Sequence, residues 1–259
     1  MTRLTREVRF AIPLAGETPA VNPPNGLAGN LTEMPAMYLT LQVTLCGTVN
    51  PESNYVENIK TIDEVVRSTV VPTLTRLVQD GHYTLIRATQ AAGAILHARW
   101  AQQFVRVRLS PCMYFWCEVA DQEQTMVHLT QRFEFSAAHR LNNPDLSEQR
   151  NHEVFGKCNN PAGHGHNYEF EVTLAGTVGN AEHLIDLDEF TGIVNQLVVD
   201  RFDHRNLNVE TSEFASVIPS VENIARVIHD LLADQFAAPV RLHRVRVWET
   251  GKTWAEYVP

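Results

Sequence analysis

The sequence contains few cysteines and no long apolar run. Four cysteines in 259 residues are too few and too scattered to form a disulfide framework. No segment approaches the roughly 20 apolar residues of a membrane-spanning helix, and the short apolar segment near the N-terminus is broken by Pro13. We therefore expect a soluble globular protein that stays in the cytoplasm and has no membrane partner. The cysteines are Cys46, Cys112, Cys117 and Cys158.

Positive charge is also in short supply. Lysine and arginine number 21 against 30 aspartates and glutamates, which gives a formal net charge of -9. Without a basic stripe there is no source of counterion release, so we do not expect a nucleic-acid partner. Hydrophobic residues make up 44%, which is enough for a proper core. The length fits one large domain or two small ones.

An internal repeat organises the chain. The segment Val43–Val49 reads Val-Thr-Leu-Cys-Gly-Thr-Val and recurs as Val-Thr-Leu-Ala-Gly-Thr-Val over Val172–Val178. Two copies of one unit of about 120 residues therefore fill the chain. We predict a first domain over 1–118 and a second over 119–259, joined near the polar stretch 121–124.

The second copy has the clearer secondary structure. Alternating apolar residues predict strands, and apolar stripes at helical spacing predict two helices, capped by Asp186 and Ser220. A long polar loop is expected between the first two strands. The order β-β-α-α-β-β predicts an α+β unit, an antiparallel four-stranded sheet with both helices on one face. Strands are placed at about 131–139, 165–178, 242–249 and 253–258, and helices over 187–198 and after Ser220.

Three histidines of the second copy form the clearest chemical motif. His164 and His166 are two residues apart, so on an extended chain both side chains project from one face. His139 ends an alternating run that places it on the apolar side of its own strand. Three neutral imidazoles without a fourth protein ligand indicate a catalytic zinc site with an open position.

Three unrelated histidines around a Gly-rich turn would be the simpler interpretation. The following strand argues against it, because its apolar residues share the parity of His164 and His166 and form a core-facing row. Imidazoles at the end of such a row need a partner, and a metal ion is a good one. The row consists of Tyr168, Phe170, Val172 and Leu174.

Cys158 lies in a Gly/Asn/Pro loop just ahead of the histidine pair. A nearby dication and Lys157 would favour its thiolate, which makes it a candidate base. The alternative is a plain loop cysteine.

Two acidic residues complete the candidate set. Asp203 precedes His204 just past the first predicted helix, where a carboxylate can orient an imidazole for proton transfer. A helix C-cap with a solvated acid would look the same. Glu249 ends a core-facing row on its strand, where a carboxylate needs donors such as the adjacent N–H groups of a pterin ring. An exposed strand end would also explain it.

Together these motifs resemble the 6-pyruvoyl-tetrahydropterin synthase family over about 133–257. The resemblance implies the tunnelling fold, in which the antiparallel sheets of several units join into a barrel with active sites between subunits. The motifs are Phe-Ser-Ala-Ala-His139-Arg, Phe-Gly-Lys-Cys158-Asn-Asn-Pro-Ala-Gly-His164-Gly-His166-Asn-Tyr, Asp203-His204-Arg-Asn-Leu and Trp-Glu249-Thr.

The resemblance also implies an activity and a role for each residue. The family's enzymes are lyases that eliminate triphosphate from 7,8-dihydroneopterin triphosphate. Lys157 and Arg140 are the local cations that we assign to its phosphates, and solvated loop positions would explain both residues equally well. By the same resemblance zinc is held by His139, His164 and His166, protons are handled by Cys158, Asp203 and His204, and the pterin is held by Glu249 with help from Ser220.

Two other functions stay open. The related 6-carboxytetrahydropterin synthase of the deazapurine pathway uses the same substrate and metal but releases acetaldehyde. It usually has fewer residues between the cysteine and His-Gly-His, so the five-residue gap here favours the pyruvoyl type. A non-catalytic pterin-binding protein is the other alternative, and the intact Cys158, Asp203 and His204 argue against it.

The first copy resembles a tunnelling-fold unit that has lost its chemistry. A lone sheet of this type leaves two open edges, and closing it into a barrel with neighbours removes them. We therefore expect a homo-oligomer, a trimer or a hexamer, most simply three chains that present six units. Aligned through the repeat, Gly16 falls near the position of His139, Pro35 and Met37 at those of His164 and His166, and Pro111 at that of Glu249.

Overall fold

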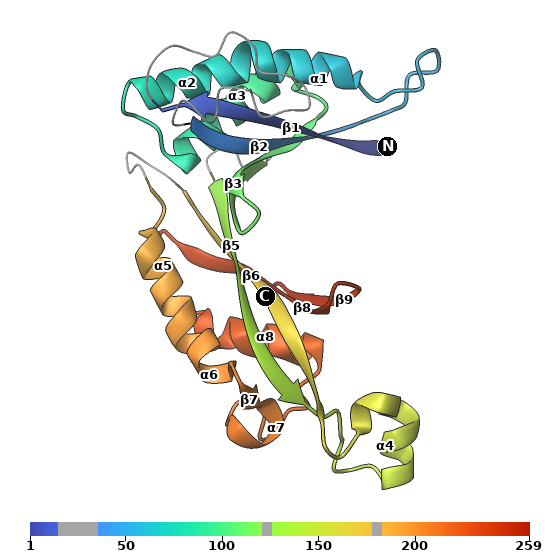
Figure 1. The fold of residues 1–259 in the computed structure, drawn as a ribbon. Coiled ribbons are helices and arrows are strands. Elements are labelled where there is room, and N and C mark those ends of the chain that lie inside the picture. Colours follow the sequence, from blue (N-terminus) through green and yellow to red (C-terminus); the bar gives the residue numbers. More distant parts are fainter. Residues whose placement is uncertain (15–35, 121–125, 178–182) are drawn as a thin grey trace. The chain divides into compact units, whose positions relative to one another are not determined.

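The computed structural model describes residues 1–14, 36–120, 126–177 and 183–259, which form two compact units (Figure 1). One unit comprises Met1–Leu129 with Gly176–Leu184, and the other comprises Thr130–Ala175 with Ile185–Pro259. The junction predicted at 121–124 lies outside the described residues, so the domain boundary at 118/119 stays a prediction.

The first unit is an antiparallel sheet in the order β1-β2-β3-β4 with helices between β2 and β3. Asn58 caps the first helix and Thr84 caps the last, each with a side-chain oxygen that accepts a backbone N–H. The elements are β1 (Thr2–Pro13), β2 (Ala36–Gly47), α1 (Ile59–Val65), the π-helical segment η1 (Val66–Val70), α2 (Val71–Gln79), α3 (Leu85–Trp100), β3 (Phe104–Cys112) and β4 (Phe115–Ala120).

The second unit repeats this order as β5-β6-β8-β9, and the short strand β7 pairs in parallel with β5. The predicted caps Asp186 and Ser220 are confirmed, since each accepts backbone N–H groups at its helix start. The elements are β5 (Met126–His139), α4 (Glu148–Phe155), the 3₁₀ segment η3 (Gly156–Asn159), β6 (His164–Thr177), α5 (Leu187–Val194), the π-helical segment η4 (Asn195–Val199), α6 (Asp200–Phe202), β7 (Arg205–Asn206), α7 (Leu207–Glu210), α8 (Val221–Leu232), β8 (Arg241–Thr250) and β9 (Thr253–Tyr257).

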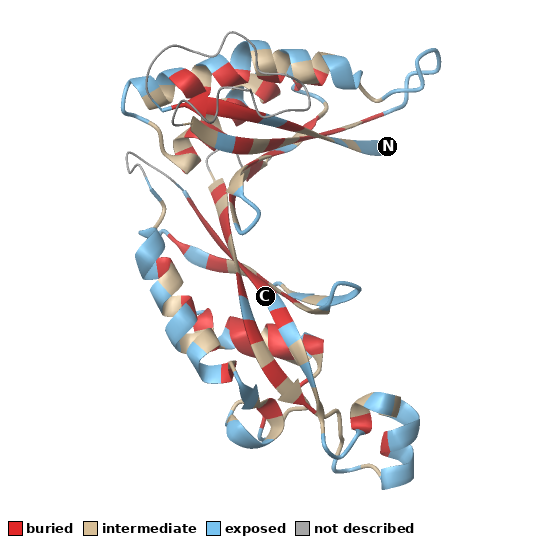
Figure 2. Ribbon diagram, in the orientation of Figure 1, coloured by how far each residue is buried: buried red, intermediate tan, exposed pale blue. Residues whose placement is uncertain are grey.

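The predicted alternation sets the core of the second unit. Figure 2 shows buried bands along β5 and β6, and each predicted core-facing row is buried. Phe170 faces Val247 and Val172 faces Val245 across β6 and β8, so the rows meet under α8. The buried rows are Phe133, Phe135, Ala137 and His139 on β5, and Tyr168, Phe170, Val172 and Leu174 on β6.

The prediction of a long polar loop between β5 and β6 was wrong in part, because this segment contains α4 and η3. Ser147 caps α4 by accepting the backbone N–H of Arg150 at 3.2 Å. Asn151 is the one buried residue of this helix, so there is no apolar stripe from which a helical period could be predicted. Asn151 ties the helix to the preceding loop, since its side chain accepts from Asn143 N at 2.7 Å and donates to Asn143 O at 2.8 Å.

The repeat extends to strand register. Val43 faces Val107 in the first unit, and Val172 faces Val245 at the matching position of the second. The ladder shifts at Thr44/Leu45 and again at Thr173/Leu174, which are equivalent positions. In each unit the helical run that follows the second long strand also contains a π-helical segment, η1 after β2 and η4 after β6. Shared irregularities of this kind support a duplication.

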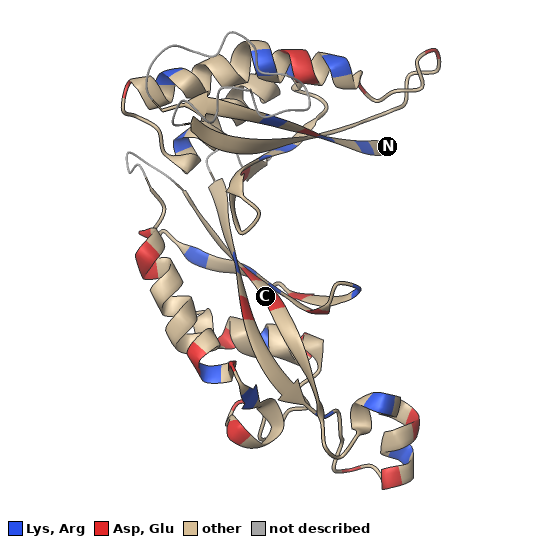
Figure 3. Cartoon of the chain, viewed as in Figure 1, with Lys and Arg blue, Asp and Glu red and all other residues tan. Residues whose placement is uncertain are grey.

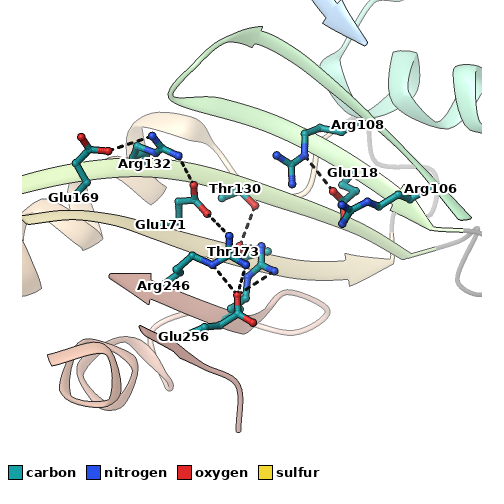
Figure 4. A network of polar contacts seen from close by, with 11 residues as sticks. Arg106, Arg108, Glu118, Thr130, Arg132, Glu169, Glu171, Thr173, Arg246 and Glu256 are labelled. Atoms are coloured by element: carbon teal, nitrogen blue, oxygen red, sulfur yellow. Dashed lines mark hydrogen bonds and ion pairs between the residues drawn. The ribbon is translucent and has the colours of Figure 1, made fainter. Parts of the chain in front are cut away.

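A polar cluster on the second hairpin of each unit is also duplicated (Figure 4). In the first unit Glu118 accepts from Arg108 at 3.1 Å, and the Arg108 guanidinium lies 4.7 Å from the Trp116 ring centroid. In the second unit Glu256 accepts from Arg246 Nε at 2.8 Å, and Arg246 lies 4.8 Å from the Trp254 ring centroid. Both hairpins therefore keep the same stacked ion pair.

Charges of both signs are interspersed over the described residues, as Figure 3 shows. In the described part of the chain, no helix is long and apolar enough to cross a membrane.

Candidate active site

His139 is the most buried member of the candidate site, at 1% exposed. Its Nδ1 lies 2.7 Å from the carbonyl oxygen of Pro219, the residue before the N-cap of α8. A carbonyl only accepts, so Nδ1 carries the proton and the Nε2 of the neutral ring presents a lone pair. A backbone carbonyl that fixes the tautomer in this way is the usual second partner of a metal-binding histidine.

His164 and His166 open β6 beside the end of β5. The close approach depends on Gly163, which has φ +71° and whose missing Cβ would lie 3.1 Å from His139 O. Only glycine adopts that backbone conformation without strain. As a result His139 Nε2 and His164 Nε2 lie 3.1 Å apart, and the His166 ring centroid is 5.2 Å from that of His139.

Glu249, near the end of β8, joins the three histidines. Its Oε1 lies 2.9 Å from His166 Nε2 and 3.3 Å from His139 Nε2. The ligand atoms of His139, His164, His166 and Glu249 all lie within 4.8 Å of one another, and no other such cluster occurs among the described residues. The alternative of an exposed strand end does not hold, because the Glu249 side chain is only 16% exposed.

The charge state of this cluster fits a bound cation. Burial lowers the pKa of both His139 and His166, so both rings are neutral near pH 7. The buried His166 Nε2 has no partner with hydrogen-bond geometry, and neither has His164 Nδ1. A proton shared between His139 and His164 would account for their 3.1 Å contact, but not for a carboxylate oxygen beside two ring nitrogens. A metal ion would take one lone pair from each ring, including that of His166 Nε2, together with the carboxylate oxygen.

Tyr168 forms the floor of the cluster and is 0% exposed. Its ring packs edge-on against His139 at 5.9 Å and His166 at 5.6 Å, and stacks on Phe135 at 5.0 Å. Burial raises the pKa of Tyr168, and Glu249 and Cys158 raise it further. Its position in the alternating row predicted only that Tyr168 faces the core. The alternation does not tell which aromatic rings lie around it.

Cys158 lies in η3 and is half-buried. Its carbonyl accepts the backbone N–H of Leu141 at 2.9 Å, which ties η3 to the segment that follows His139. The structure therefore brings Cys158 to the metal-binding end of the unit, in a 3₁₀ turn where a plain loop had been expected.

Asp203 and His204 follow α6, just past the first helical run as predicted, and the next two residues form β7, which pairs with β5. Asp203 Oδ1 accepts Ser136 N–H at 2.8 Å, and its Oδ2 lies 2.7 Å from His204 Nδ1. The Ser136 hydrogen bond lowers the pKa of Asp203, and His204 lowers it further. The pair therefore serves as an oriented imidazole with an ionised partner, although the His204 side chain is 84% exposed.

One cavity of about 550 Å³ is lined by both His166 and His204. Ser136, Gly165, Asn167 and Glu210 also line it. A ligand in this cavity would contact a candidate metal ligand and the candidate proton-transfer histidine together.

The other predicted substrate contacts lie elsewhere. Lys157 lines a separate cavity with Glu148 and His152. Arg140 donates to Asn159 O at 2.9 Å, so its guanidinium holds the end of η3. Ser220 Oγ accepts Asn223 N–H at 3.4 Å as the N-cap of α8, and Ser220 follows the Pro219 carbonyl that contacts His139.

The first unit shows no equivalent cluster among the described residues. Met37 lies in β2 and Pro111 in β3, at the positions that match His166 and Glu249, and neither offers a metal ligand. The matching positions Gly16 and Pro35 lie outside the described residues.

The second half of the chain is similar to proteins of one known family. The model of the 6-pyruvoyl tetrahydropterin synthase family matches residues 128–259, just over half of the chain. The 6-pyruvoyl tetrahydrobiopterin synthase of Drosophila melanogaster is 38% identical over 136 residues, 52% of this chain and 81% of the relative. The Homo sapiens protein of that name is 37% identical over 130 residues, 50% of this chain and 89% of the relative. A solved structure of Caenorhabditis elegans 6-pyruvoyl tetrahydropterin synthase is 37% identical, with a TM-score of 0.49 over 52% of this chain and 96% of that one.

Proposed function

The chain belongs to the 6-pyruvoyl tetrahydropterin synthase family, and we propose that it is a zinc-dependent lyase that eliminates triphosphate from 7,8-dihydroneopterin triphosphate. The observation that carries the proposal is the convergence of His139, His164, His166 and Glu249 in the half of the chain that matches the family. In that half all the predicted proton-transfer residues are present.

Zinc is the metal we propose for the cluster, held by the three histidines. Neutral imidazoles are common zinc ligands, and a catalytic zinc keeps a position open to substrate. When bound, zinc would act as a Lewis acid toward oxygens of the substrate side chain.

The proton-transfer work falls to this chain's own residues. Cys158 is the base we propose, and its thiolate would remove a side-chain proton. His204, oriented by Asp203, would return one to the ring. Glu249 would hold the pterin through its adjacent N–H groups. Roles of Ser220 and Lys157 in substrate binding remain part of the proposal, although neither lines the cavity shared by His166 and His204.

Assembly follows from the two units, for which we propose domains over 1–118 and 119–259. His204 is 84% exposed, whereas a group that moves a proton to or from carbon works best shielded from water. The chain also has open edges at β1 and β9. We propose a homo-oligomer of three chains or a multiple of three, in which neighbouring units enclose the site and the first unit provides edges and walls.

The decisive experiment is to incubate the purified, zinc-loaded chain with 7,8-dihydroneopterin triphosphate and to analyse the products by mass spectrometry. We expect inorganic triphosphate and a 6-pyruvoyl pterin. Release of acetaldehyde with a 6-carboxy product would assign the alternative activity. Binding without turnover would identify a non-catalytic pterin-binding protein. His166→Ala should abolish turnover, whereas Met37→Ala at the matching position of the first copy should leave it unchanged.

A further inference from the structure

The carboxylate of Glu249 has partners that a pterin anchor alone does not explain. Its Oε1 lies 2.9 Å from His166 Nε2 and 3.3 Å from His139 Nε2, with the His139 and His164 nitrogens 3.1 Å apart. Two zinc ligands at about 2.0–2.1 Å in a tetrahedral site lie roughly 3.3 Å from each other. These three separations are close to that value, and the ligand atoms of all four side chains lie within 4.8 Å of one another, which favours one closed site with four protein ligands.

The charge of such a site also favours a carboxylate. Three neutral imidazoles leave the charge of a dication uncompensated in a buried pocket, where His139 is 1% exposed. A carboxylate ligand removes half of that charge and satisfies its own need for a partner. Other glutamates on these strands differ from Glu249, because they pair with arginines and lie outside the cluster. They are Glu171, Glu256 and Glu118.

Glu249 is also placed where the backbone leaves it room to move. The ladder between β8 and β9 shifts between Trp248 and Thr250, so Glu249 has no paired residue on β9. The ladder between β6 and β8 ends at Trp248, so it has none on β6 either. A residue in such a bulge can re-aim its side chain without breaking strand pairs. The hairpin turn follows at once, at Gly251.

We propose that Glu249 is a fourth, exchangeable metal ligand, which closes the metal site in the resting protein and leaves it when a pterin binds. The proposal rests on the function proposed above. The N–H groups of the pterin would compete for the carboxylate, and its departure would open one position on the metal. Substrate recognition and the opening of the site would then be a single event, so the metal would stay capped until the correct ring is bound.

The test uses the full chain loaded with Co²⁺, whose visible absorption reports the number of its ligands. Wild type should show the intense bands of a four-coordinate ion, and Glu249→Gln should show a changed spectrum. Competition with a chelator should show metal affinity reduced about 10- to 100-fold in Glu249→Gln. Glu249→Asp, which keeps the charge on a shorter side chain, should fall between. Glu256→Gln, on the same hairpin but paired with Arg246, should match wild type.

Exchange is tested by adding 7,8-dihydropterin, which carries the pterin ring without the side-chain oxygens that the metal would bind. Saturating pterin should shift the Co²⁺ spectrum of the wild type and should hardly change that of Glu249→Gln. Unchanged metal affinity and spectrum in Glu249→Gln would overturn the proposal, whatever the activity. A wild-type spectrum that stays constant while pterin binding is measured by fluorescence would overturn the exchange. Failure to release triphosphate from a protein whose spectrum responds to Glu249→Gln would refute the proposed function instead.

Discussion

His139 Nδ1 lies 2.7 Å from the carbonyl oxygen of Pro219, although 80 residues separate them in the chain. The contact joins the end of β5 to the start of α8, whose cap Ser220 is the next residue. The orientation of the most buried candidate ligand therefore depends on where α8 begins. Packing of that helix and metal affinity should change together.

We expect about one zinc per chain, bound through the second copy. The described part of the first unit contains no comparable cluster, and the histidines of the second converge within 4.8 Å. Elemental analysis of the purified chain checks this. His166→Ala should lose the metal, and Met37→Ala at the matching position should retain it. Two zinc ions per chain would contradict the assignment of the first copy as inactive.

Cys158→Ala should separate chemistry from binding. If Cys158 transfers protons and does not bind zinc, its loss should slow turnover by a factor on the order of 10² to 10⁴ while metal content and pterin affinity stay the same. Single-turnover rates and equilibrium binding measure the two effects. Loss of zinc from Cys158→Ala would show that the residue has a different role.

Gly163→Ala should destabilise the fold and distort the histidine cluster. A Cβ at this position would lie 3.1 Å from His139 O, and φ is +71°, so we expect a loss of about 1–3 kcal/mol. Gly192→Ala provides the matched control. A Cβ there meets nothing within 4 Å inside α5, so it should stabilise by about 0.5–1 kcal/mol. Urea denaturation measures both, and equal effects would contradict the close approach of β5 and β6.

The metal-free protein should lose stability on mild acidification. Burial lowers the pKa of His139 and His166 in the folded state, so the unfolded chain binds more protons once the pH falls below about 6.5. Stability is thus fully present above that pH and declines as the pH falls toward the folded values. Thermal unfolding in excess chelator at several pH values between about 7.5 and 5 tests this. His166→Gln should show a shallower decline, and an equal slope would count against the neutral cluster.

The oligomer should contain three chains or a multiple of three, and activity should depend on it. Light scattering with the active protein measures the mass. A stable, active monomer would rule the arrangement out. So would full activity from a monomeric fragment over 119–259.

Much of the second unit could be predicted because its alternating apolar residues show which face of each strand lies toward the core. The parity of His139 with Phe135, and of His166 with Tyr168, placed both histidines at core-facing strand ends, where the structure has them. Other features depend on contacts that a single residue type does not encode. Every residue has a backbone carbonyl, so sequence alone does not show that the carbonyl of Pro219 contacts His139. Helix α4 buries one residue and therefore lacks an apolar stripe. The sequence also does not show that Arg140 donates a hydrogen bond to Asn159. Glu249 had the right parity, but only its distances to two ring nitrogens show a possible metal ligand.

The paired ladder shifts at Thr44/Leu45 and Thr173/Leu174 have a consequence for how the two halves tolerate change. A bulge sets the local bend and twist of a strand, and it occurs at the same step in the half that carries the histidines and in the half that does not. The bend of the sheet is therefore common to both halves, whereas among the described residues the histidine cluster occurs in the second half alone. The unpaired residue of each bulge lies on β3 and β8, so substitutions that straighten β3 should be tolerated as poorly as those that straighten β8. Substitutions of polar side chains at the tip of the first sheet should be nearly silent.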